Sequence, residues 1–159
     1  MQRLPITTEN AIARLEALCA RAEHCSFELS TKLRGWGITG ASAEKIINHL
    51  IDNRFVDDLR FAQSFVRDRY RFSGHGRRKI ILALIAKHIP RDIIDTALEE
   101  IDDEIYFDNL CHFINRKASS LNMSLFEDRN KVYRCAIGRG FESSLIVCAL
   151  KLYISNNQE

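Results

Sequence analysis

The sequence predicts an all-α fold, an elongated, curved tandem array of three three-helix repeats. An apolar pattern recurs about every 50 residues, a period typical of stacked helical units. The chain also has only 2 prolines and 7 glycines, which favours helices over loops, and 46% of its residues are hydrophobic, enough for a continuous core. Tandem helical arrays usually offer an extended surface to a large partner rather than an enclosed active site.

Each repeat is centred on the same pattern. An apolar pair spaced i, i+4 is followed by a helix-stop position and then by another apolar residue, and a second apolar helix comes after it. The three copies are Leu29, Leu33, Gly37 and Ile38; Ile80, Leu84, His88 and Ile89; and Val132, Ala136, Gly140 and Phe141. We therefore expect repeats over residues 1–55, 56–101 and 102–154, with a flexible tail over residues 155–159.

In the first repeat, a helix is predicted from about Thr8, with that residue or Thr7 as its cap. The second helix has Ser26 as a favourable N-cap and stops at residues 35–37, where two glycines occur. The third helix is predicted to begin near Ser42.

The second repeat opens with acidic residues 57–58, which the helix dipole favours at an N-terminus. Residues 73–76 break this helix. The following segment, residues 77–87, is apolar nearly all round, and this predicts a helix that is buried on several sides in the middle of the stack. Pro90 marks the start of the last helix of the repeat.

The third repeat begins with acidic residues 102–104. Residues 121–125 are predicted as a loop and residues 127–137 as a helix that ends at the segment 138–140. A helix over residues 142–154 closes the array.

The cysteines and the hydropathy indicate the compartment. The chain has 5 cysteines and no CxxC spacing, and Cys19, Cys135 and Cys148 fall in helical stretches, so we expect reduced, mostly buried thiols. Residues 1–10 contain no apolar signal segment, and the longest uncharged apolar run, residues 80–86, is too short to span a bilayer. We expect a cytoplasmic protein with no membrane partner.

The net charge of +2 is too small to indicate a class of partner, but the charged residues are distributed unevenly along the chain. Basic residues crowd the segment 67–79, opposed there by Asp68 alone, and acidic residues crowd the segment 99–108. Such a field favours a charged partner over a neutral small molecule.

Three stretches carry motifs that, in their order and spacing, resemble the RecX family of regulatory proteins. They are Arg21, His24, Ser26, Glu28-Leu29 and Lys32-Leu33; then Phe55-Val56-Asp57-Asp58, Arg60-Phe61-Ala62 and Phe65-Val66, continued by Gly76 to Ile80; and finally Lys131, Arg134 and Arg139-Gly140-Phe141. The sequence departs from the family at His88, where a glycine is usual. Either this histidine adopts a left-handed conformation itself, which a non-glycine residue tolerates poorly, or the turn differs. The sequence also has Ala83 where the family often has glutamate.

The resemblance implies a modulator of the RecA recombinase. Members of the family lie in the helical groove of the RecA–DNA filament or cap its growing end, and they inhibit strand exchange, ATP hydrolysis and coprotease activity. Such a protein needs no cofactor and is not an enzyme.

The candidate filament-binding residues are basic. The main cluster, on adjacent helices, suits bidentate pairing with carboxylates or phosphates. It comprises Arg67, Arg71, Arg77, Arg78 and Lys79, and the flanking repeats add Lys32, Arg34, Lys131, Arg134 and Arg139. The alternatives are a solvated helix face for the main cluster and compensation of helix dipoles for the flanking residues. Trp36 is expected to pack on its own repeat rather than to serve as a contact anchor.

Other functions are less well supported. The adjacent pairs His24-Cys25 and Cys111-His112 point about 100° apart on a helix, so they make no pair of metal ligands. No set of polar residues indicates an enzyme. The alternative function is a stand-alone helical module that binds single- or double-stranded DNA through its basic patch. Because both ends of such an array need polar capping, a monomer is expected.

Overall fold

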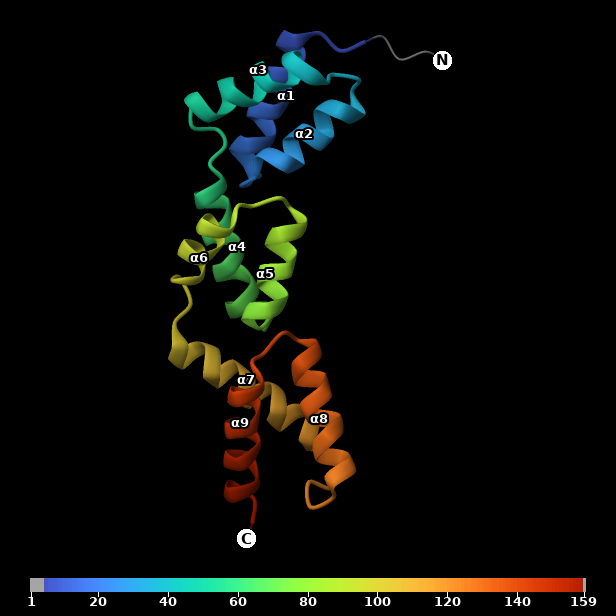
Figure 1. The fold of residues 1–159 in the computed structure, drawn as a ribbon, viewed down its shortest axis with the longest axis vertical. Coiled ribbons are helices and arrows are strands. Elements are labelled where there is room, and N and C mark those ends of the chain that lie inside the picture. Colours follow the sequence, from blue (N-terminus) through green and yellow to red (C-terminus); the bar gives the residue numbers. More distant parts are fainter. Residues whose placement is uncertain (1–4, 159) are drawn as a thin grey trace.

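The structure, a computed structural model, describes residues 5–158, which form three groups of three helices arranged end to end (Figure 1). Residues 1–4, in the first predicted repeat, and residue 159, in the predicted tail, lie outside the described residues. The helices are α1 (Thr8–Arg21), α2 (Ser26–Gly35), α3 (Gly40–Asp52), α4 (Asp58–Arg71), α5 (Arg77–Ala86), α6 (Arg91–Leu98), α7 (Asp103–Ala118), α8 (Phe126–Gly138) and α9 (Ser143–Asn156). No strand forms within residues 5–158, and the predicted all-α tandem array is confirmed.

Most helices begin at the positions that their capping residues predicted. The Thr7 side chain accepts a hydrogen bond from the backbone of Asn10, and Asp57 and Asp102 cap α4 and α7 in the same way. Two boundaries differ from the prediction by two residues. Helix α3 starts at Gly40 rather than near Ser42, and α9 continues to Asn156, into the segment predicted as a tail.

The prediction that α5 is buried on several sides is wrong. Ile80 and Leu84 are fully buried, but Leu82 is 67% exposed and Ile85 is 50% exposed. The reason is the end-to-end arrangement, in which α5 packs along its length against α4 and α6 of its own group (Figure 1). The middle repeat therefore has its ends covered by its neighbours, while the outer side of α5 stays open.

The hydrophobic core is divided into two clusters rather than continuous. One lies within the first group of helices, around Leu15, Leu29 and Leu50. The other runs through the second and third groups, where α4 packs directly against α7, and it includes Val66 and Ile114. The second and third groups thus share one core, which Cys25 and Phe27 of the first group also join, and the rest of the first group has its own.

The cysteines are free, as expected, but the prediction that they are mostly buried holds only in part. Cys25 is buried, whereas Cys19 and Cys111 are half-buried. Cys135 and Cys148 are exposed, because the single layer of repeats leaves one face of α8 and of α9 open to solvent.

The second and third groups meet through a direct backbone contact. The amide of Gly76, at the start of α5, donates a hydrogen bond to the Arg139 carbonyl oxygen at 2.8 Å, and the Arg78 amide donates to the Gly140 carbonyl oxygen at 3.1 Å. A Cβ atom on Gly76 would lie 2.2 Å from the carbonyl carbon of Gly140. Gly140 also has a left-handed φ of 95°. Both positions therefore require glycine.

The first and second groups meet at equivalent positions, but through side chains. His88 takes the place of Gly140 and adopts a left-handed conformation, with φ of 57°, which is one of the two expected alternatives. Its imidazole stacks on Phe27, with the ring centroids 4.0 Å apart. Lys87 Nζ donates to Glu28 Oε1 at 2.5 Å. Partial burial favours a raised pKa for Glu28, but hydrogen bonds from Lys87 and His24 outweigh it and lower that pKa.

The N-cap of α2 belongs to this same junction. The prediction that Ser26 is the N-cap is wrong, because the cap position is held by Cys25, which makes no side-chain capping bond. Instead, Asp58 Oδ1 accepts a hydrogen bond from the Ser26 amide at 2.8 Å. A carboxylate of the second group thus satisfies the exposed helix end of the first.

Substituting alanine for Gly76 should destabilise the protein. The new Cβ would overlap the Gly140 backbone, and overpacking of this kind costs about 1–3 kcal/mol or more. The matched control is Gly138→Ala, since Gly138 lies in α8 and a methyl group added there would have no atom within 4 Å. The control should be neutral or more stable by up to about 1 kcal/mol. Urea unfolding followed by circular dichroism measures both, and equal stability of G76A and wild type would contradict the tight junction.

Candidate functional site

The candidate basic residues divide into paired and unpaired side chains around the junction of the second and third groups. The unpaired side chains near this junction lie on two surfaces. The basic groove is defined by Arg71, Arg116 and Arg139, and the α5 ridge is defined by Arg78, Lys79, Leu82 and Ile85.

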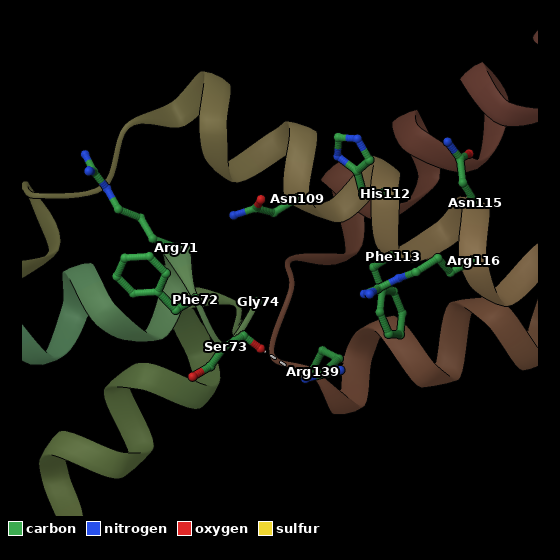
Figure 2. A pocket seen from close by; sticks show the side chains of 10 residues that line it. All are labelled: Arg71, Phe72, Ser73, Gly74, Asn109, His112, Phe113, Asn115, Arg116 and Arg139. Carbon is green, nitrogen blue, oxygen red and sulfur yellow. Dashed lines mark hydrogen bonds between the residues drawn. The ribbon is translucent and has the colours of Figure 1, made fainter.

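The basic groove has a volume of about 550 Å³. Figure 2 shows Arg71 and Phe72, at the C-terminal end of α4, on one side of it, and His112 and Arg116 of α7 on the other. Arg139, from the turn between α8 and α9, lies between these walls. No carboxylate of the described residues lines the groove.

Two of the three groove arginines, Arg71 and Arg139, are held in place by neutral partners. Arg139 Nη1 donates to the Ser73 carbonyl oxygen at 3.2 Å, and its guanidinium lies 5.3 Å from the centre of the Phe113 ring. Arg71 Nε donates to the Tyr70 hydroxyl at 2.9 Å. Within the described part of the chain, none of the three groove arginines forms an ion pair, so their positive charge is available to a ligand.

His75 reports the electrostatic field at this junction. Burial lowers its pKa, and the nearby charges of Lys79, Arg69 and Arg139 lower it further. Its pKa therefore lies below the ordinary value of 6.5, so the imidazole is neutral at pH 7. The groove and the start of α5 together form one electropositive region.

Two of the candidate arginines are instead committed to ion pairs. Arg67 Nη1 lies 2.9 Å from Glu100 Oε2. Arg77 Nη1 lies 3.0 Å from Glu142 Oε1, and Nη2 pairs with Asp103. The cluster is thus not opposed by Asp68 alone, because the fold brings in carboxylates that are remote in sequence.

A buried tyrosine completes the Arg77 network. The Tyr106 hydroxyl donates to Glu142 Oε2 at 2.7 Å and accepts a hydrogen bond from the Arg77 amide at 2.8 Å. Burial and the neighbouring Glu142 carboxylate raise the Tyr106 pKa, which keeps the hydroxyl protonated as a donor. Arg77 therefore joins the second group to the third.

The α5 ridge combines free cations with exposed apolar side chains. Arg78 and Lys79 are exposed, and neither forms an ion pair with a described residue. Leu82 and Ile85 follow on the same open side of the helix. A mixed basic and apolar strip suits a macromolecular partner better than a small ligand.

Apart from Arg139, the candidates in the outer groups are not brought into these surfaces. Lys32 and Arg34 are exposed on α2, and Arg134 is exposed on α8. Lys131 pairs with Asp128 at 2.8 Å. The structure thus places them on the second helices of their own groups, and their role in binding stays a prediction.

Trp36 is half-buried and packs against the core of the first group, as expected. Arg14 lies over its ring, 5.8 Å from the centre.

Sequence reasoning missed Phe72, His112 and Arg116. Phe72 is an aromatic residue that follows the last turn of α4. Its position outside the apolar periodicity of that helix is the one sequence signal that could have identified it as a surface residue. Arg116 was missed because a basic residue in the last turn of a helix, here α7, is usually explained by its favourable interaction with the helix dipole.

Neither a metal centre nor a membrane segment is found in the described part of the chain. No three His, Cys, Asp or Glu side chains there are placed to hold a metal ion. None of the helices in residues 5–158 combines the length and the hydropathy that crossing a bilayer requires.

Comparisons with known proteins agree on one family. The family model described as "RecX, second three-helix domain" matches residues 57–98. "Regulatory protein RecX" of Prosthecochloris aestuarii is 30% identical over 149 residues, covering 94% of this chain and 97% of that protein. The Vibrio campbellii protein of the same name is 36% identical over 99 residues, covering 62% and 63%. The crystal structure of RecX from Lactobacillus salivarius has the same fold, with a TM-score of 0.81 at 23% identity over 91% of this chain and 94% of that one.

The role of Arg77 in joining the second group to the third can be tested by measuring the free energy of unfolding. Arg77→Gln removes the charged contacts to Glu142 and Asp103 and should cost about 1–3 kcal/mol, because a partly buried carboxylate loses its partner. Arg78→Gln, at the neighbouring unpaired position, should change stability by no more than about 0.5 kcal/mol. Chemical unfolding compares the two, and equal effects would show that the Arg77 network contributes nothing.

Proposed function

Since the chain belongs to the RecX family of regulatory proteins, we propose that it regulates the RecA recombinase by binding the RecA–DNA filament. Binding inhibits strand exchange, ATP hydrolysis and coprotease activity. The protein acts in the cytoplasm as a monomer, without a cofactor and without chemistry of its own.

The unpaired cations at the junction of the second and third groups are the observation that carries this proposal. Arg78 and Lys79 on the α5 ridge lie beside the groove arginines, and no carboxylate of the described residues neutralises them. A RecA–DNA filament presents both phosphates and acidic side chains along its length. An elongated array of helices can follow such a partner over a long contact, as solenoid proteins do (Figure 1).

ATP hydrolysis by RecA on single-stranded DNA tests the proposal. The protein, added well below one copy per RecA, should suppress hydrolysis, because one bound molecule bridges neighbouring protomers and its effect propagates. No suppression at equimolar protein would contradict the proposal.

A charge-reversal variant tests whether the α5 ridge contacts the filament. Arg78→Glu with Lys79→Glu should raise the half-inhibitory concentration by roughly tenfold or more, since like charges facing each other at an interface cost several kcal/mol. Arg77 is left intact because its ion pair with Glu142 joins the second group to the third. The control, Lys45→Glu with Lys151→Glu, makes the same change in net charge on α3 and α9, away from the junction. Equal inhibition by the two variants would exclude the α5 ridge.

The second candidate function is a stand-alone DNA-binding module, and the carboxylate-free groove favours it. The two functions differ in their requirements. If the protein binds duplex DNA directly, the binding constant falls as the salt concentration rises. A plot of log binding constant against log salt concentration then has a slope of about −0.9Z, where Z is the number of phosphates contacted. Filament binding requires RecA and nucleotide.

A further inference from the structure

The helix-stop turns of the three repeats lie in different surroundings. The α5–α6 turn packs on the start of α2, and the α8–α9 turn packs on the start of α5 (Figure 1). The apolar residue just after the stop position is buried in both turns, with Ile89 5% exposed and Phe141 1% exposed. The equivalent Ile38 of the α2–α3 turn is only half-buried, since no repeat precedes it in the described chain. A turn that contacts a helix start in the other two repeats is therefore open here.

The backbone of the α2–α3 turn is accessible. A Cβ atom on Gly37 would have no atom beyond its chain neighbours within 4 Å, whereas one on the equivalent Gly140 would lie 2.5 Å from the backbone nitrogen of Lys79. The carbonyl oxygens of Arg139 and Gly140 accept hydrogen bonds from the start of α5, but no described backbone amide donates to those of Trp36 and Gly37. The α2–α3 turn thus leaves free the groups with which the α8–α9 turn binds its neighbour.

The opposite end of the array exposes apolar side chains at the start of α8 (Figure 1). Leu125, the N-cap residue, is 53% exposed, and Phe126, the first residue of the helix, is 71% exposed. At the start of α2, Phe27 stacks on His88 of the next repeat. Phe126 has a similar place on its helix, but it forms no aromatic pair with a described residue. Because the end of a helical array usually has a polar outer face, this apolar end indicates a surface that another molecule covers.

The length of α8 decides which kind of contact this end can make. In the register of the repeats, Asp128 takes the place of Gly76. It lies inside α8 rather than before the helix, and it carries a side chain. A backbone contact like that between Gly76 and Gly140 is therefore blocked. Docking at this end must use side chains, as it does at the junction of the first and second groups.

The charges of the two ends are complementary. Glu127 is exposed in the first turn of α8, and Lys32 and Arg34 are exposed in the last turn of α2, just before the open turn. None of the three forms an ion pair with a described residue. The junction of the first and second groups has the same polarity, since Lys87 in the later turn pairs with Glu28 at the start of the earlier helix. The two ends lie at opposite extremes of the molecule, so each can meet its complement only on another copy (Figure 1).

We propose that copies of this chain associate head to tail, with the start of α8 of one molecule on the α2–α3 turn of the next. Phe126 packs on Trp36 of the next molecule. Glu127 pairs with Lys32 or Arg34 there. Because every molecule has one end of each kind, the contact continues the array from copy to copy and does not close a dimer.

The contact is small, so it is weak between free molecules, which remain monomers at low concentration. Copies bound side by side on a filament have a high effective concentration, which turns a weak contact into cooperative binding. This cooperativity rests on the proposed function, whereas the head-to-tail contact itself does not require RecA.

Sedimentation velocity of the full chain, without RecA, tests the contact. The weight-average sedimentation coefficient should rise steadily from low micromolar to several hundred micromolar protein, without levelling off at the value of a dimer. Phe126→Ser should weaken association by roughly tenfold or more, as loss of a central aromatic residue at an interface does. The matched control is Phe72→Ser, which removes an 83% exposed phenylalanine at the C-cap of α4 and should associate like wild type. Both variants should fold, because both phenylalanines are exposed.

A charge swap tests the polarity of the contact. Glu127→Lys alone should prevent association, and so should Lys32→Glu with Arg34→Glu, because like charges then face each other. An equimolar mixture of these two variants should associate again, since each altered end meets an end of opposite charge. A contact between two identical ends would not lose association in both variants, because each variant leaves one of the two ends unchanged.

The inference is wrong if wild type stays monomeric over the whole concentration range, if association stops at a dimer, or if Phe126→Ser associates as tightly as wild type. Inhibition of RecA ATPase by wild type and Phe126→Ser is measured alongside. We expect the same maximal inhibition but a less cooperative titration curve for Phe126→Ser, and identical curves would overturn the cooperativity. Association without inhibition would contradict the proposed function alone, whereas inhibition without association would contradict only the head-to-tail contact.

Discussion

The backbone contact between Gly76 and Gly140 is the constraint on which the functional surface depends. It docks the turn after α8 on the first residues of α5, so that two carbonyl oxygens of one repeat accept amide hydrogens of the other. Because of this contact, Arg139 reaches the Ser73 carbonyl oxygen and Arg77 reaches Glu142. The basic groove exists because the α4–α5 turn and the α8–α9 turn meet here without side chains between their backbones.

The other junction shows what the same position does without glycine. His88 accepts the strain of a left-handed conformation, and its ring stacks on Phe27. Polar contacts, from Lys87 to Glu28 and from Asp58 to the Ser26 amide, add to this stack. Most of the first group keeps its own core, whereas the other two groups share one that Cys25 and Phe27 join at the junction. The array is therefore built from one unit of two fused repeats and one repeat attached through side chains.

The fold follows from local sequence signals, whereas the site depends on long-range contacts. Apolar spacing and capping residues such as Asp57 predict the helices, and the stop position limits His88 to a left-handed conformation or a different turn. The sequence does not show that Arg77 pairs with Glu142, since that partner approaches only in the folded chain. Nor does it show that Leu82 stays open, because apolar composition alone does not distinguish end-to-end from side-by-side packing.

We propose that the electropositive junction of the second and third repeats faces the RecA–DNA filament. Hydrogen exchange of the protein, free and bound to RecA filaments on single-stranded DNA, tests it most directly. We predict slower exchange of backbone amides in residues 71–79 and in the α8–α9 turn on binding. Protection confined to α3 and α6, with unchanged exchange at the junction, would contradict it.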